Sequence, residues 1–67
     1  MSRIWEPQPR EVLQGWVKAV TEEAHRLNDW ETTFMILIAI RVENGASLTQ
    51  TQEETLEGIY DKKTSHP

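Results

Sequence analysis

The stretch 28–45 constrains the fold of this 67-residue chain most, because it contains the only long apolar run, residues 34–40. Asn28 followed by Glu31 predicts a capping box, in which each side chain bonds a backbone N–H of the first helical turn. Asn44 followed by Gly45 is typical of a helix that closes through a left-handed residue. These signals predict a central helix over residues 29–44.

A β-strand is the competing interpretation of the same stretch. Ile36, Ile38, Ile40 and Val42 are β-branched and recur at a spacing of two, which is typical of strands. The signals at both ends and a length of about four turns favour the helix.

Apolar side chains surround most of this predicted helix. At about 100° per residue, one face carries Trp30, Phe34, Leu37, Ile38 and Arg41, and the flanks and back carry Met35, Ile36, Ala39, Ile40 and Val42. A helix that is apolar nearly all round is either central in a fold or shared between two chains. It is too short to span a bilayer, which needs roughly 20 apolar residues.

Two further helices are predicted, one on each side of the central one. Apolar residues recur at helical spacing over 10–27, and Thr49 with Gln52 predicts a capping box that opens a helix over 49–62. Because of its prolines, the stretch 1–9 is predicted to be an extended arm. Residues 64–67 are predicted to be a frayed tail. The fold class is therefore all-α, a single-domain three-helix bundle in up-down-up order. The predicted core is Trp16, Trp30, Phe34, Leu37, Ile38, Leu56 and Ile59.

Composition argues against several kinds of site. The chain has no cysteine and two histidines, so we expect neither a disulfide framework nor a metal ion or other cofactor. The net charge of −4 argues against a surface that follows nucleic-acid phosphates. No nucleophile with a base and an orienting group is evident, so we expect no enzyme. The lack of a signal peptide or membrane segment favours the cytoplasm.

Seven residues are candidates for binding a partner, and each also has a purely structural interpretation. Trp5 either anchors a partner or folds back onto the core, and Arg41 either forms a specific ion pair or extends past the helix end. The acidic side of the last helix is either a docking surface or a solvated face. The candidates are Trp5, Met35, Ile36, Arg41, Glu53, Glu57 and Tyr60.

The second half of the chain carries a motif. Trp30, Glu31 and Phe34 read W-E-x-x-F, and residues 48–60 read L-T-x-x-Q-x-x-x-L-x-x-I-Y. This pattern resembles a short helical hairpin that recurs in small phage and bacterial proteins, some of them associated with nucleic-acid metabolism. The resemblance implies a helical hairpin. Residues 42–61 contain no Lys or Arg, although such segments often carry basic residues around the glycine turn and in the last helix.

Two functional hypotheses follow from the sequence. The favoured one is a small, non-catalytic bacterial or phage-type module that binds another protein. The alternative is an accessory domain of nucleic-acid metabolism that uses Arg3, Arg10, Lys18, Arg26, Lys62 and Lys63. Apolar surface left over on the central helix, at Met35, Ile36, Ala39 and Val42, favours a homodimer over a monomer in which the N-terminal arm covers it.

Overall fold

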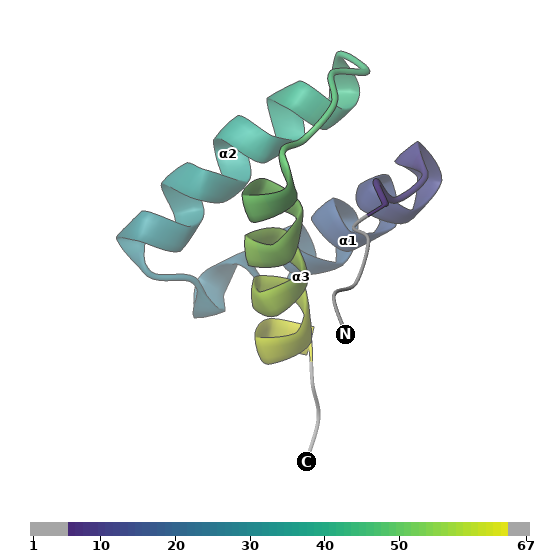
Figure 1. The fold of residues 1–67 in the computed structure, drawn as a ribbon. Coiled ribbons are helices and arrows are strands. Elements are labelled where there is room, and N and C mark those ends of the chain that lie inside the picture. Colours follow the sequence, from purple (N-terminus) through teal and green to yellow (C-terminus); the bar gives the residue numbers. More distant parts are fainter. Residues whose placement is uncertain (1–5, 65–67) are drawn as a thin grey trace.

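A computed structural model gives the fold, and it describes residues 6–64. The chain forms α1 (Arg10–Glu22), a single 3-10 turn η1 (Ala24–Arg26), α2 (Asp29–Glu43) and α3 (Gln50–Thr64) (Figure 1). Within the described residues there are three α-helices and no strand, so the predicted all-α class is confirmed. Trp5, for which packing onto the core was one predicted alternative, lies outside the described residues, and the up-down-up order stays a prediction.

The sequence signals at the helix ends are present as hydrogen bonds. Asn28 and Glu31 form the reciprocal capping box of α2, and Thr49 and Gln52 form the same arrangement before α3. Gly45 ends α2 with a φ of 73°, a backbone conformation that residues with a side chain rarely adopt. The predicted first helix is the exception, since it ends at Glu22 and continues only as η1.

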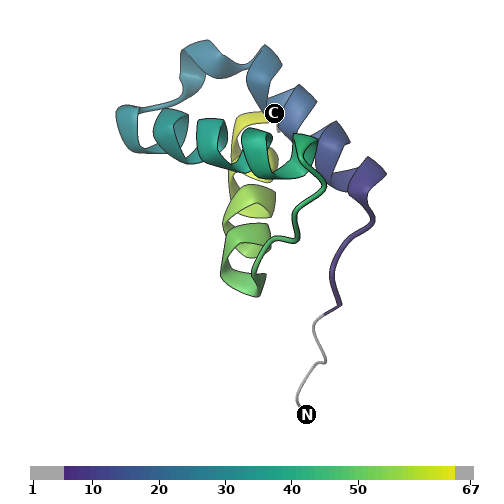
Figure 2. The same cartoon turned by 90° about the horizontal axis from the view of Figure 1, so that it is seen from above.

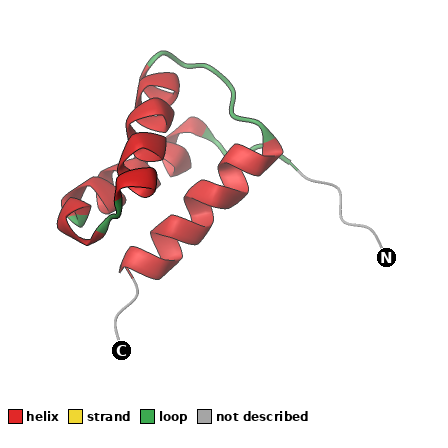
Figure 3. Ribbon diagram, turned by 90° about the vertical axis from the view of Figure 1, so that its left-hand side faces the viewer, coloured by secondary structure: helices red, strands yellow, loops and turns green. Residues whose placement is uncertain are grey.

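α1 is the helix that packs extensively against both of the others, whereas α2 and α3 contact each other least. Figure 2 shows α3 running across α2 at a steep angle, and Figure 3 shows the 44–49 loop that joins them. The sequence predicted that the middle helix would organise the fold. α1 has this role instead, because α2 turns only one side toward its neighbours.

The core consists of one apolar row from each helix and the loop residue Leu48. Val20, Ile38 and Leu56 are almost fully enclosed, and half-buried aromatic side chains, among them Trp16, Phe34 and Tyr60, pack around them. Trp16 and Tyr60 stack with their ring centroids 5.7 Å apart. The buried apolar residues are Leu13, Val20, Met35, Ile38, Val42, Leu48, Leu56 and Ile59.

The core predicted for α2 is partly wrong. Ile38 is buried, but Trp30 is 62% exposed and Leu37 is 58% exposed, whereas Met35 and Val42 are buried. The helix therefore turns inward the flank that carries Met35 and Val42, together with Ile38, whereas Ile36 on the predicted back of the helix is exposed. Both sides are apolar, so hydrophobicity alone does not choose between them.

The same substitution at a buried and at an exposed leucine tests this packing. Leu56 is fully buried, so Leu56→Ala should lower the free energy of unfolding by about 2–5 kcal/mol, through lost burial and a residual cavity. That is a large part of the roughly 3–10 kcal/mol expected for a domain of this size. Leu37→Ala should change it by no more than about 0.5 kcal/mol. Urea unfolding at low protein concentration measures both, and equal losses would contradict the orientation of α2.

Candidate interaction surface

The outward side of α2 exposes four large apolar side chains. Trp30, Ile36, Leu37 and Ile40 are each more than half exposed, at 62%, 56%, 58% and 51%. They belong to one helix and fall on one side of it, opposite to the buried row that contains Met35 and Ile38. We call these four residues, with Thr33 between them, the outer face of α2.

An aromatic pair lies at the edge of the outer face. The rings of Trp30 and Phe34 stack in parallel, with centroids 5.5 Å apart and an interplanar angle of 9°. Residues four apart on a helix are neighbours, so this pair forms within α2 itself. Phe34 is half-buried against the core, which holds the Trp30 ring in place on the surface. A supported aromatic side chain loses little conformational freedom when a partner covers it.

Glu31 lies on the inward side of α2 and contacts the end of α3. Its Oε1 accepts a hydrogen bond from the Asn28 backbone N–H at 3.0 Å and lies 3.4 Å from Nζ of Lys63 in the last turn of α3. The residue is 6% exposed. The Asn28 N–H, and after it the Lys63 ammonium, keep the pKa of the Glu31 carboxyl below its ordinary value. The start of α2 is thus joined to the end of α3.

Two arginines bind carbonyl groups at helix ends. Arg10 donates from Nε to the Val42 carbonyl at 3.1 Å and from Nη2 to the Glu43 carbonyl at 2.8 Å, at the last turn of α2. Arg26 donates to the Lys63 carbonyl at 2.7 Å, at the last turn of α3. Carbonyls in the last turn of a helix lack the usual intrahelical N–H and carry the negative end of the helix dipole, and the Val42 carbonyl also accepts the Gly45 N–H at 3.1 Å. Much of the positive charge of the described chain is therefore used inside the fold.

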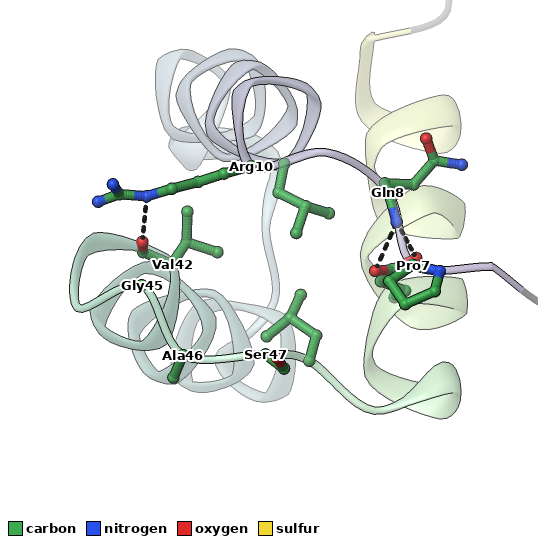
Figure 4. A pocket seen from close by; sticks show the side chains of 10 residues that line it. Pro7, Gln8, Arg10, Val42, Gly45, Ala46 and Ser47 are labelled. Atoms are coloured by element: carbon green, nitrogen blue, oxygen red, sulfur yellow. Dashed lines mark hydrogen bonds between the residues drawn. The ribbon is translucent and has the colours of Figure 1, made fainter.

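A small hollow of about 140 Å³ lies where the start of the chain meets α2 and α3 (Figure 4). Arg10, Val42 and Leu48 contribute to its wall. Glu53 is 5% exposed there and accepts the Gln8 backbone N–H with both carboxylate oxygens, at 3.0 and 3.3 Å. Glu53 thus fastens the N-terminal segment to α3, which accounts for its burial.

The predicted partner-binding residues do not form one surface. Ile36 and Arg41 are exposed on α2, and Glu57 is exposed on α3. Tyr60 is half-buried against Trp16. Trp5 lies outside the described residues.

The prediction that Met35 and Glu53 bind a partner is wrong, because both residues are buried and neither is available to a partner. Met35 belongs to the inward row of α2, next to Ile38. Glu53 was expected on a solvated or docking strip, but the N-terminal segment covers it.

Arg41 follows the second of its two predicted alternatives. It is exposed and extends past the end of α2, where its Nη2 donates to the Ser47 carbonyl at 3.3 Å. Trp30, Leu37 and Ile40, by contrast, were missed as candidates for binding. Their signal was present in the sequence, because a helix that is apolar all round must leave one side uncovered when only two helices pack on it.

The comparisons with known proteins give no relative. No family model matches the chain, and neither the curated proteins nor the solved structures contain a significant match. The resemblance of residues 30–60 to a phage and bacterial hairpin therefore stays a prediction. Among the described helices, none is long and apolar enough to cross a membrane. Residues 6–64 contain no group of three or more histidines and acidic residues arranged to hold a metal ion.

Glu31→Gln tests the junction between α2 and α3. Glutamine can still accept the Asn28 N–H but loses the attraction to Lys63. A carboxyl with a lowered pKa stabilises the fold above its ordinary pKa of about 4.3, and this contribution disappears as the pH falls through the lowered value. Glu31→Gln should therefore lower the melting temperature at pH 7, and the gap to the wild type should close in acid.

Glu57→Gln is the matched control, because Glu57 is exposed on α3. Thermal unfolding of the three proteins, followed by circular dichroism from neutral to acidic pH, measures the effect. A gap between wild type and Glu31→Gln that stays constant across this range would contradict the ion pair.

Proposed function

We propose that this protein is a non-catalytic interaction module, of the small bacterial or phage type, that acts by binding a protein partner through the outer face of α2. The observation that carries the proposal is the exposure of Trp30, Ile36, Leu37 and Ile40 on one side of one helix. Small soluble proteins rarely leave contiguous apolar patches uncovered unless the patch binds something. Trp is also enriched among the residues that dominate binding energy.

The fold also supports a protein partner over a nucleic acid. Arg10, Arg26 and Lys63 were candidates for phosphate contacts, and each binds a carbonyl or carboxylate within the chain. Affinity for nucleic acid depends on the number of phosphates that Lys and Arg side chains neutralise. A chain with a net charge of −4 and several internally bound cations is poorly suited to that task. The cytoplasmic location expected from the sequence stays an expectation.

Site-specific photo-crosslinking tests the proposed surface. A photoreactive amino acid at Leu37 should form covalent adducts with a protein in cells that express this chain natively, because the site lies on the exposed side of α2. The same amino acid at Glu57 is the control, since that position is exposed on another helix. Equal adduct yields from both positions, or none from Leu37, would contradict the proposal.

Nucleic-acid binding should be absent at physiological salt. We expect no change in fluorescence anisotropy when labelled duplex or single-stranded DNA or RNA is titrated with the protein at an ionic strength of about 0.15 M. Lowering the salt should produce weak binding at most. Tight binding with a steep salt dependence would favour the accessory domain of nucleic-acid metabolism instead.

A further inference from the structure

A row of residues with opposite charges at its two ends runs along the outer face of α2 and extends beyond it at both ends. Asp29, Thr33, Leu37 and Arg41 follow one another at intervals of four and form a single ridge along the helix. All four are exposed. The acidic end is at the first turn of α2 and the basic end is at the last turn. Twelve residues at a rise of about 1.5 Å place the two charges roughly 18 Å apart along the helix axis.

The ridge is complementary to itself when it is reversed. If a second α2 lies antiparallel across it, Asp29 meets Arg41 of the second copy, and Arg41 meets Asp29 of the second copy. The centre of this arrangement lies at residue 35, so Thr33 lies opposite Leu37 of the second copy. A parallel pair would bring like charges together at both ends, which is unfavourable. Antiparallel helix dipoles add to the preference.

The apolar residues beside the ridge fit the same arrangement. Ile36 and Ile40 form a second ridge one step around the helix, and Trp30 with Phe34 forms a third on the other side. Reversal about residue 35 places Trp30 opposite Ile40 of the second copy, so the largest exposed ring meets an exposed aliphatic side chain. Ridges at a spacing of four pack into the matching grooves of another helix, the commonest class of helix contact.

The area available suits a modest dimer. Trp30 alone, 62% exposed, presents on the order of 150 Å² of surface. With Ile36, Leu37 and Ile40, the face reaches a few hundred Å², the size at which patches on soluble proteins are often functional. A standard interface uses about 800 Å² on each partner. The outer face of α2 would therefore form the apolar centre of a small interface with a polar rim.

We propose that the outer face of α2 binds a second copy of this chain, with the two α2 helices antiparallel about a twofold axis. This inference rests on the proposed function and specifies its partner. A twofold contact uses the same surface on both copies and closes after two, so it forms no filament. The Asp29–Arg41 contacts fix the antiparallel direction, and Trp30, Ile36, Leu37 and Ile40 form the buried centre.

Sedimentation equilibrium of the purified chain over a range of micromolar concentrations tests the dimer. The wild type should change from 7.8 kDa to twice that mass as the concentration rises. Leu37→Glu and Ile36→Glu each place a charge in the centre and should weaken the dimer by about 100-fold or more. Both residues are exposed, so the helical circular-dichroism signal should stay unchanged. A single species of 7.8 kDa throughout, or a dimer that both variants leave intact, would overturn the proposal.

Charge reversal tests the antiparallel direction. Asp29→Arg or Arg41→Asp alone should weaken the dimer by about tenfold, because each sets like charges against each other across the interface. The double variant restores opposite charges between the copies and should recover most of the affinity. Within one copy the two positions lie too far apart to compensate each other, so recovery arises only across the interface. Glu57→Arg on α3 is the control and should leave the dimer unchanged.

If the single variants weaken the dimer and the double variant does not recover the affinity, the antiparallel arrangement is overturned. The outcomes also separate this inference from the proposed function. A monomeric wild type whose Leu37 crosslinks to a different protein refutes the second copy but leaves the interaction module standing. A monomer without any crosslink from Leu37 refutes both.

Discussion

The contact between Glu31 and Lys63 joins the start of α2 to the end of α3, the two helices that otherwise contact each other least. One carboxylate oxygen accepts the N–H that opens α2 and also lies beside the ammonium group that ends α3. Glu31 points inward to reach Lys63, and the residues one, two and three turns further along lie on the same side of α2. Met35, Ile38 and Val42 are buried there in the apolar core, and the opposite side of α2 faces outward. The surface available to a partner is thus the side of α2 that lies opposite to this polar contact and to the buried apolar row.

The polar contacts of this small fold occur mainly where helices end. Arg10 and Arg26 each bind carbonyl groups in the last turn of another helix, and Glu53 binds the Gln8 N–H at the entry to α1. A helix end is where backbone groups need partners from elsewhere, so such contacts specify which ends lie together. The apolar core supplies the driving force for folding, while these contacts define the arrangement of its helices.

The sequence was informative about local structure and less informative about which side of α2 is buried. The caps at Asn28 and Thr49 and the turn at Gly45 depend on residues within the same few turns, and all three were predicted correctly. Met35 is buried by residues of the other helices, and Glu53 is covered by Gln8, so both depend on residues distant in the sequence and local patterns could not indicate their burial. For the same reason Trp30 and Leu37 were assigned to the core, and the candidate surface was recognised only in part.

The position of α1 in the fold has a consequence for how the chain folds. α1 is the first helix, and its most extensive packing is with α3, the last helix, with α2 and both loops in between. Closing so long a loop has an entropic cost before any contact between Leu13 and Leu56 can offset it. Helical proteins usually fold fast because their contacts are local. In this chain, the step that limits folding should be the arrival of α3 on α1, after the α2 caps have formed.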